Sequence, residues 1–225
     1  MIESASFLAA LVIGFLGGVH CVGMCGSIVG AMSFNIGPQT HNKIVVLNLA
    51  YNIGRIASYM IAGLLAGGLG FLLVAGSYEP QIKTTLHIFA NLILLALGLY
   101  LAKFWSGIVY LERAGNYIWK LIAPLAGKFF PFTNISQGFI AGILWGWLPC
   151  GLVYSVLIWA AASSSPLAGA WYMLGFGIGT LPNLLALGLF VDRLKTYLQK
   201  KALRVGAGML LVIYAIYKLF KLLIA

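Results

Sequence analysis

Charged residues are scarce in this chain. Asp, Glu, Lys and Arg together make up 8% of its 225 residues, whereas a soluble domain carries about a quarter. Hydrophobic residues make up 62%, and the mean hydropathy is +1.00. This composition excludes an ordinary soluble globular domain and indicates an integral membrane protein, with lipid as its surroundings.

Acidic residues are the scarcest charged type, with 4 Asp and Glu against 14 Lys and Arg, for a net charge of +10. The basic residues gather in loops between apolar runs rather than on one continuous basic face, so we expect no nucleic-acid partner. The stretch Met1–Phe7 lacks a basic residue and carries Glu3, which is not typical of a signal peptide.

Alternating strand patterns are also missing. Lipid cannot hydrogen-bond an exposed backbone, so spanning segments are helices or a closed barrel, and these apolar runs are too long and too continuous for barrel strands. The sequence predicts an all-α membrane protein, residues 1–225 forming a single transmembrane domain. We expect six transmembrane helices, over about 6–34, 44–74, 84–104, 136–162, 166–191 and 203–223.

The loop charges predict how the chain is oriented. With the N-terminus outside, ten Lys and Arg fall on the inner side and three on the outer side. Positive charge collects on the cytoplasmic side of membrane proteins, so we expect both termini outside a multi-pass protein of the bacterial inner membrane. Residues 105–135 are rich in aromatics and basic residues, and we expect an amphipathic inner loop there.

The chain contains a weak internal repeat. "GFLGGVHCVGMCGSIVG" in the first predicted span resembles "GFIAGILWGWLPCGLVY" in the fourth, and both run from Gly-Phe to a Cys-Gly pair. These pairs are Cys25-Gly26 and Cys150-Gly151. Two halves of three helices each, about 1–104 and 136–225, must insert with opposite topology, an arrangement that places a working site between the halves.

Cysteine is rare as well, with three in the whole chain, and none lies in a predicted loop. In "HCVGMCG", Cys21 and Cys25 are four residues apart and share a helix face, while His20 and Met24 share the adjacent flank. A single buried cysteine is often an inert hydrophobe. The matched positions of Cys25 and Cys150 favour a different interpretation, in which the two face each other across the repeat axis.

The fourth span carries a helix breaker beside its cysteine. Pro149 cannot donate to the helical hydrogen-bond ladder, so we expect a kink or break just before Cys150. A half-helix that begins there would place Cys150 at its N-terminus, where the helix dipole favours the nucleophilic thiolate.

These motifs resemble those of a known family. "HCVGMCG" together with "WGWLPCGLVY" is similar to the cytochrome c biogenesis protein transmembrane-region family, also labelled sulfite exporter TauE/SafE-like or UreH-like and related to the DsbD membrane domain and CcdA. "YNIGR" and "GFGIGTLPNLL" also resemble family features, so the likeness covers nearly the whole chain.

The resemblance implies a thiol–disulfide electron carrier that uses a reversible Cys25–Cys150 pair and needs no cofactor. Its implied partners are a cytoplasmic thioredoxin-like donor and a periplasmic thioredoxin-like acceptor, and its implied role is in cytochrome c or cytochrome oxidase maturation. The chain departs from the CcdA pattern, which has proline on both sides of the first-helix cysteine.

An alternative stays open. His20, Cys21, Met24 and Cys25 form a soft ligand set suited to Cu(I), and Cys150 adds a third sulfur. On this hypothesis the protein is a copper transporter or metallochaperone, supplied by copper chaperones, and the resemblance allows it. Export of another small solute and a purely structural assembly role are further alternatives.

Polar residues inside the other spans need their own interpretation. Arg55 lies within the second span, where a charge is costly and often functional, although its stem is long enough to snorkel toward the inner interface. Asn48 and Asn52 are typical of residues that join helices by hydrogen bonds. Pro182 and Asn183 predict a break in the fifth span, with a gating hinge as the alternative.

Overall fold

A computed structural model describes residues 7–18, 21, 41–75, 79–102, 104, 134–148, 150–189 and 201–224. Within these ranges the chain forms seven helices and no strand. The prediction of an all-helical protein is therefore confirmed for the part of the chain that the structure describes.

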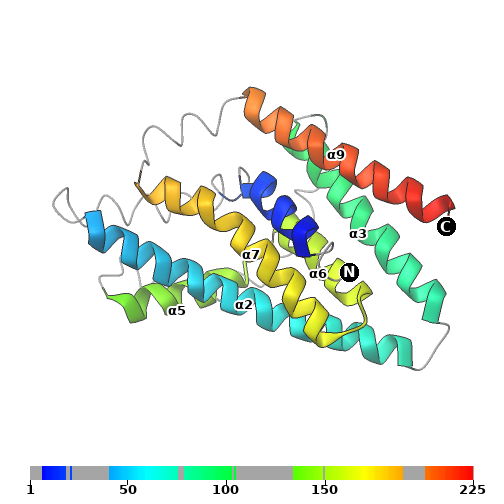
Figure 1. The fold of residues 1–225 in the computed structure, drawn as a ribbon, viewed down its shortest axis with the longest axis horizontal. Helices are drawn as coiled ribbons and strands as arrows, with labels where there is room; N and C mark the ends of the chain where they lie inside the picture. The colour runs from blue at the N-terminus through cyan, green and yellow to red at the C-terminus, as the bar shows by residue number, and fades with distance from the viewer. Residues whose placement is uncertain are drawn as a thin grey trace.

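The helices largely follow the predicted spans (Figure 1). Their bounds are Phe7–Gly18, α2 (His41–Ala75), α3 (Glu79–Leu101), α5 (Ile135–Gly146), α6 (Gly151–Ala162), α7 (Pro166–Leu189) and α9 (Lys201–Ile224). Of the predicted first span, residues 7–18 and Cys21 are helical, and the rest lies outside the described residues. The predicted inner loop also lies outside them, apart from its last two residues, Asn134, which is the N-cap of α5, and Ile135, which begins it.

Two helices are long and apolar enough to cross a membrane, over Val45–Leu73 and Pro166–Gly188. The pair α5 and α6, bent by 74°, makes a third candidate if it forms one span. The apolar parts of the N-terminal helix, α3 and α9 are each shorter than 18 residues, and a span takes about 20. The chain is a membrane protein, while six spans in two inverted repeats with both termini outside stay a prediction.

The helices pack through closely approaching backbones. α2 lies against α7 and α5, and α3 lies beside α9, as Figure 1 shows. Gly63 and Gly169 face each other where α2 meets α7, and a Cβ added at either would collide with the carbonyl oxygen of the other. Small residues at such contacts let membrane helices approach closely, so the glycine-rich part of α2 from Gly63 to Gly70 is a packing surface.

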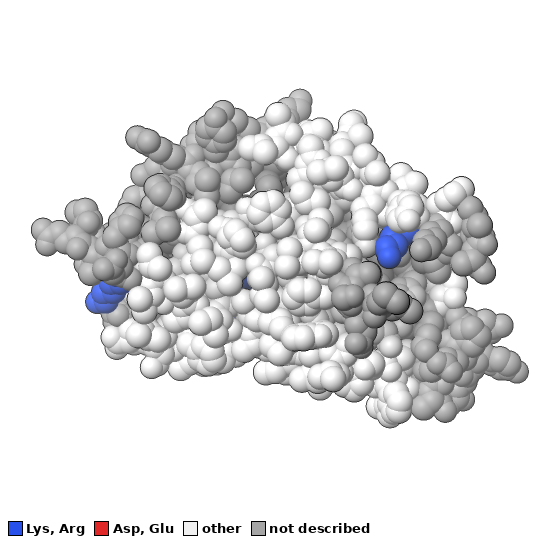
Figure 2. Space-filling view, in the orientation of Figure 1, with Lys and Arg blue, Asp and Glu red and all other residues white. Residues whose placement is uncertain are grey.

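The outer surface is suited to lipid. Figure 2 shows a face that is almost free of charge, with described Lys and Arg atoms mainly near its two ends. Large apolar side chains such as Leu69, Leu72, Ile213 and Phe220 are exposed. On a soluble protein so much apolar surface would promote aggregation, whereas in a membrane it contacts acyl chains.

The predicted break at Pro182 is wrong. α7 runs through Pro182 without interruption to Leu189. Proline removes one backbone hydrogen bond, but neighbouring helices can compensate for this inside a membrane. Here the next residue, Asn183, donates from Nδ2 to the carbonyl oxygen of Phe15 at 2.8 Å and ties this turn of α7 to the N-terminal helix.

Candidate functional site

Cys150 lies at a break between two helices. α5 ends at Gly146, where Trp147 and Leu148 donate to carbonyls three residues back, at 3.3 and 3.0 Å. Cys150 has extended backbone angles (φ −130°, ψ 146°), and its carbonyl accepts the first bond of α6 from Tyr154 N at 3.1 Å. The prediction that the fourth span breaks before Cys150 is confirmed, although Pro149 itself lies outside the described residues.

This position gives the Cys150 thiol a particular environment. Cys150 is the N-cap residue of α6 and is only 8% exposed. Backbone N–H groups of the first helical turn point toward the N-cap, and the helix dipole places partial positive charge there. The structure therefore places a buried thiol at the N-terminus of α6.

The N-terminal helix reaches the same place. Gly17 lies so close to Leu152 that a side chain at position 17 would collide with it. Cys21 is 5% exposed and belongs to the same buried apolar core as Cys150. The structure therefore brings the first and fourth predicted spans together beside the start of α6.

Several predicted site residues cannot be placed. His20, Met24, Cys25 and Gly26 lie outside the described residues, so neither the Cys25–Cys150 pair nor the soft ligand set is tested. Gly151 begins α6 directly after Cys150. Among the described residues, no group of three or more His, Cys, Asp or Glu is placed to hold a metal ion.

Arg55 is buried in the protein and does not snorkel to the interface. Its side chain, in the middle of α2, is 2% exposed. Nη2 donates to the Tyr59 hydroxyl at 2.7 Å and Nη1 to Asn52 Oδ1 at 3.3 Å. The guanidinium carbon also lies 5.8 Å from the ring centre of Tyr51 and 5.3 Å from that of Tyr59, within the range of cation–π attraction.

The neighbouring asparagines connect this group to α7. Asn52 Nδ2 donates to the Asn48 carbonyl and to Asn48 Oδ1, both at 2.8 Å. Asn48 Nδ2 donates to the Leu184 carbonyl at 3.1 Å. The predicted role of joining helices is confirmed for Asn48, while Asn52 bonds within α2 and helps to hold Arg55.

Three further residues of α2 make contacts that were not predicted: Tyr51, Ser58 and Tyr59. Tyr51 and Tyr59 flank Arg55 at four-residue spacing, so the three share one face of α2. That spacing was visible in "YNIGRIASY". Ser58 donates from Oγ to the Ile143 carbonyl at 2.8 Å and holds α2 against α5, a contact between residues 85 apart that no local pattern indicates.

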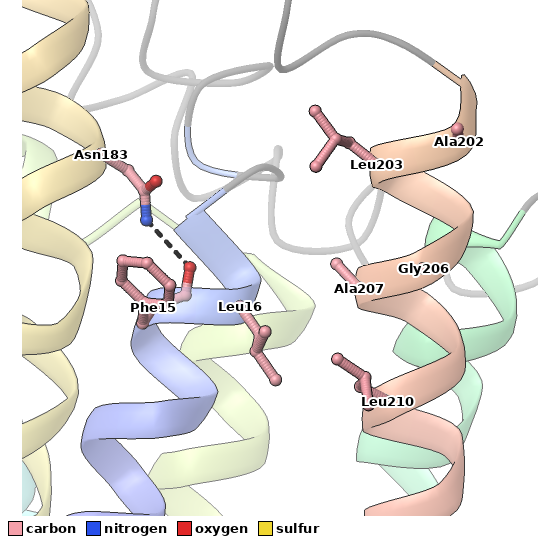
Figure 3. A pocket seen from close by; sticks show the side chains of 8 residues that line it. All are labelled: Phe15, Leu16, Asn183, Ala202, Leu203, Gly206, Ala207 and Leu210. Atoms are coloured by element: carbon pink, nitrogen blue, oxygen red, sulfur yellow. Dashed lines mark hydrogen bonds between the residues drawn. The ribbon is translucent and has the colours of Figure 1, made fainter.

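A separate apolar groove opens between the N-terminal helix, α7 and α9 (Figure 3). Its volume is about 490 Å³. The Asn183–Phe15 hydrogen bond lies in one wall of this groove. The lining residues are Phe15, Leu16, Asn183, Ala202, Leu203, Gly206, Ala207 and Leu210. None of these side chains is ionisable or nucleophilic, so the groove carries no chemistry of its own.

Comparison with known protein families identifies a match over most of the chain. A family described as cytochrome C biogenesis protein transmembrane region matches residues 9–217. The comparisons with curated proteins and with solved structures give no match. The matched range extends from the N-terminal helix into α9 and includes all three cysteines.

Proposed function

The chain belongs to the family of cytochrome c biogenesis protein transmembrane regions, and on that premise we propose that it carries reducing equivalents across the bacterial inner membrane through Cys25 and Cys150. The observation that supports this most directly is the position of Cys150, buried at the N-terminus of α6 where a helix pair is broken. A carrier of this kind needs a nucleophilic thiol that is shielded from bulk oxidants yet lies at an interruption where a partner can approach.

The proposed reaction is a pair of thiol–disulfide exchanges. A thiolate of a cytoplasmic thioredoxin-like dithiol attacks one sulfur of the Cys25–Cys150 disulfide, whose S–S bond breaks as a mixed disulfide forms. The second donor thiol resolves it, leaving the donor oxidised and both membrane cysteines reduced. The reduced pair then transfers the same two electrons, with two protons, to the disulfide of a periplasmic thioredoxin-like acceptor.

Helix directions support the proposed inverted repeat. α5 and α2 run in the same direction, because Gly54 approaches Phe139 and Gly146 approaches Ser58. The N-terminal helix and α7 also run in the same direction, with Phe7 beside Gly175 and Leu11 beside Gly179.

α2 and α7 themselves run in opposite directions, because Gly63 meets Gly169 and Asn48 bonds Leu184. A twofold rotation that superimposes α2 on α7 would therefore also superimpose α5 on the N-terminal helix. This is the relation expected of two halves with inverted topology.

Differential alkylation in membranes tests the electron carrier. We expect a Cys25–Cys150 disulfide that disappears when reduced thioredoxin is supplied on the cytoplasmic side and returns when an oxidised acceptor is supplied on the other. Cys25→Ser and Cys150→Ser should each abolish both changes, and Cys21→Ser should retain them. Two thiols that stay reduced under every condition would exclude the mechanism.

Cu(I) handling is a second candidate, supported by the burial of Cys21 and Cys150 in one apolar core. Thiolate, thioether and imidazole are the donors that Cu(I) prefers, and the motif around Cys21 contains all three. In this proposal copper is the cargo and copper chaperones are the partners. We expect Cu(I) binding to fall in His20→Ala and Met24→Ala but not in His87→Ala or Met209→Ala; equal binding in all four would reject it.

A further inference from the structure

The apolar groove between the N-terminal helix, α7 and α9 is large enough to hold a ligand (Figure 3). Its volume of about 490 Å³ lies within the range of small-molecule binding sites, about 300–1,000 Å³. Gly206 lies in the α9 wall, and a Cβ added there meets nothing within 4 Å. Phe15 and Leu210, on opposite walls, are each about half exposed. The groove can therefore be entered from the surrounding lipid without displacing the backbone.

The groove has two different ends. Figure 3 shows Ala202 at one end of its α9 wall and Leu210 at the other. Ala202 directly follows the first residue of α9, and Asn183 on the facing wall lies six residues before the end of α7. In the orientation that the loop charges predict, the end of the groove at Ala202 lies on the cytoplasmic side of the membrane.

Along the groove, positive charge is confined to this end. Lys201 and Arg204 lie in the first turn of α9, next in the chain to residues that line the groove. Residues 205–217, which follow them, contain no charged residue. From Ala202 to Leu210 the groove follows about 12 Å of helix. It therefore passes from a basic end, at the first turn of α9, into wholly apolar surroundings.

Negative charge is scarce near the basic end. The one acidic residue in the described ranges, Glu79, begins α3. It precedes Gly98, which meets α9 at Gly208, by nineteen residues, or about 28 Å of helix. In the sequence, residues 192–204 contain five basic residues and one acidic residue, Asp192. The charge at the basic end therefore complements an anion.

Independently of the cysteine chemistry, we propose that the groove binds an anionic phospholipid, with one acyl chain along α9 and the phosphate at the basic end. A phospholipid has the same polarity as the groove, with an anionic group at one end of an apolar chain. Basic pockets between membrane helices on the cytoplasmic side bind such headgroups. Apolar walls alone would select no lipid, because all acyl chains are equally apolar. The positive charge supplies the preference for an anionic headgroup.

A lipid in this position would connect α9 to the N-terminal helix. α9 packs on α3, whereas in the groove Leu16 on the N-terminal helix and Ala207 and Leu210 on α9 lie on opposite sides of open space (Figure 3). An acyl chain between them would contact both helices. Because a ligand that binds only the folded protein stabilises it, the bound lipid should also raise the unfolding temperature.

Native mass spectrometry of the purified full chain in a neutral detergent tests the proposal. The anionic probe is dioleoyl phosphatidylglycerol, and the zwitterionic probe is dioleoyl phosphatidylcholine, which has the same acyl chains. Each basic residue near an anionic headgroup contributes about fivefold in affinity. We expect a single phosphatidylglycerol to bind about 25-fold more tightly than phosphatidylcholine. Equal affinities for the two lipids would overturn the proposal.

A variant that fills the groove tests the place of binding. Gly206→Leu puts a side chain into the open space and should weaken phosphatidylglycerol binding about tenfold. The control is Gly68→Leu on α2, outside the groove, where an added Cβ also has room and its nearest neighbour, Pro166 Cγ, is 3.8 Å away; it should bind as the wild type does. A folded Gly206→Leu protein with wild-type affinity overturns the proposal. If this variant does not fold, Ala202→Phe should weaken binding instead, and wild-type affinity there also overturns it.

Charge variants at the two ends of α9 test the place of the phosphate. Lys201→Gln/Arg204→Gln should weaken phosphatidylglycerol binding about 25-fold and leave phosphatidylcholine binding unchanged. Lys218→Gln/Lys221→Gln removes the same charge from the far end of the same helix and should change neither. Equal losses in the two double variants overturn the proposal. A dimer that forms without lipid and is dissociated by Gly206→Leu would assign the groove to a second copy of the chain and also overturn it.

Discussion

Two regions of the molecule contain a proline inside a predicted membrane span, and they fold differently. Around residues 147–150 the helix stops, α5 and α6 are bent by 74°, and Cys150 caps the new helix. Around Pro182 the helix α7 continues to Leu189. The same residue type thus accompanies a helix break in one span and a continuous helix in the other.

Tertiary contacts account for the difference. Next to Pro182, Asn183 donates to the Phe15 carbonyl on a neighbouring helix. In the other region, Ser58 on α2 bonds the Ile143 carbonyl just before α5 ends. Contacts with neighbouring helices thus stabilise α7 beside Pro182 and the end of α5. A proline in a membrane span does not by itself determine whether the helix continues.

The largest expected effect comes from detaching the broken pair from α2. Gly142→Ala would place a methyl group against the Tyr51 carbonyl oxygen, a backbone atom that cannot move aside. We expect a loss of about 3 kcal/mol in the free energy of unfolding, measured by thermal unfolding in detergent. The control is Gly206→Ala, where a Cβ meets nothing within 4 Å and better helix propensity should add up to about 1 kcal/mol. Equal unfolding temperatures for the two variants would contradict the packing of α5 on α2.

A smaller effect is expected when each of the two prolines is replaced by alanine and the alkylation of Cys150 is compared. Pro149→Ala permits α5 and α6 to join, which would remove Cys150 from a helix N-terminus. We expect its alkylation rate at pH 7 to fall about tenfold, or about 1.4 kcal/mol. Pro182→Ala should leave that rate unchanged because α7 is already continuous. The comparison fails if both substitutions reduce the rate alike.

The smallest effect concerns the contact that holds α7 beside Pro182. Asn183→Leu removes the bond to Phe15, and interhelical hydrogen bonds in membranes contribute about 0.6 kcal/mol on average. We expect a loss of that size in thermal stability. Asn91→Leu is a suitable reference, because the bond from Asn91 Nδ2 to the His87 carbonyl lies within α3 and does not connect two helices. A larger loss for Asn91→Leu would count against the role assigned to Asn183.

More of the fold than of the candidate site could be predicted from local sequence patterns. Continuous apolar runs predicted α2, α3, α7 and α9 to within a few residues, because an apolar run of that length has few alternatives to a helix in lipid. The helix break before Cys150 was also visible, since Pro149 cannot donate a backbone hydrogen bond. The continuity of α7 through Pro182 could not be predicted from the sequence, because the Asn183–Phe15 bond joins residues 168 apart.

Part of the candidate site could be predicted from local sequence patterns, and part depended on tertiary contacts. Sequence patterns identified Cys150 and Arg55 as chemically unusual, because thiols and charges are rare in membrane spans. They left open whether Arg55 reaches the interface, and they missed Ser58 because its partner lies on another helix. The Tyr51–Arg55–Tyr59 spacing was available in the sequence, but its meaning depends on which face of α2 turns inward.

The sequence by itself determined that this protein is a helical membrane protein in which thiols and charges are rare, because composition and hydrogen-bonding capacity are properties of the chain alone. Only the tertiary structure decided that α7 continues through Pro182, that Arg55 is buried, and that the N-terminal helix meets the start of α6. These outcomes depend on contacts between residues far apart in the chain, whose energies arise only once the helices have packed.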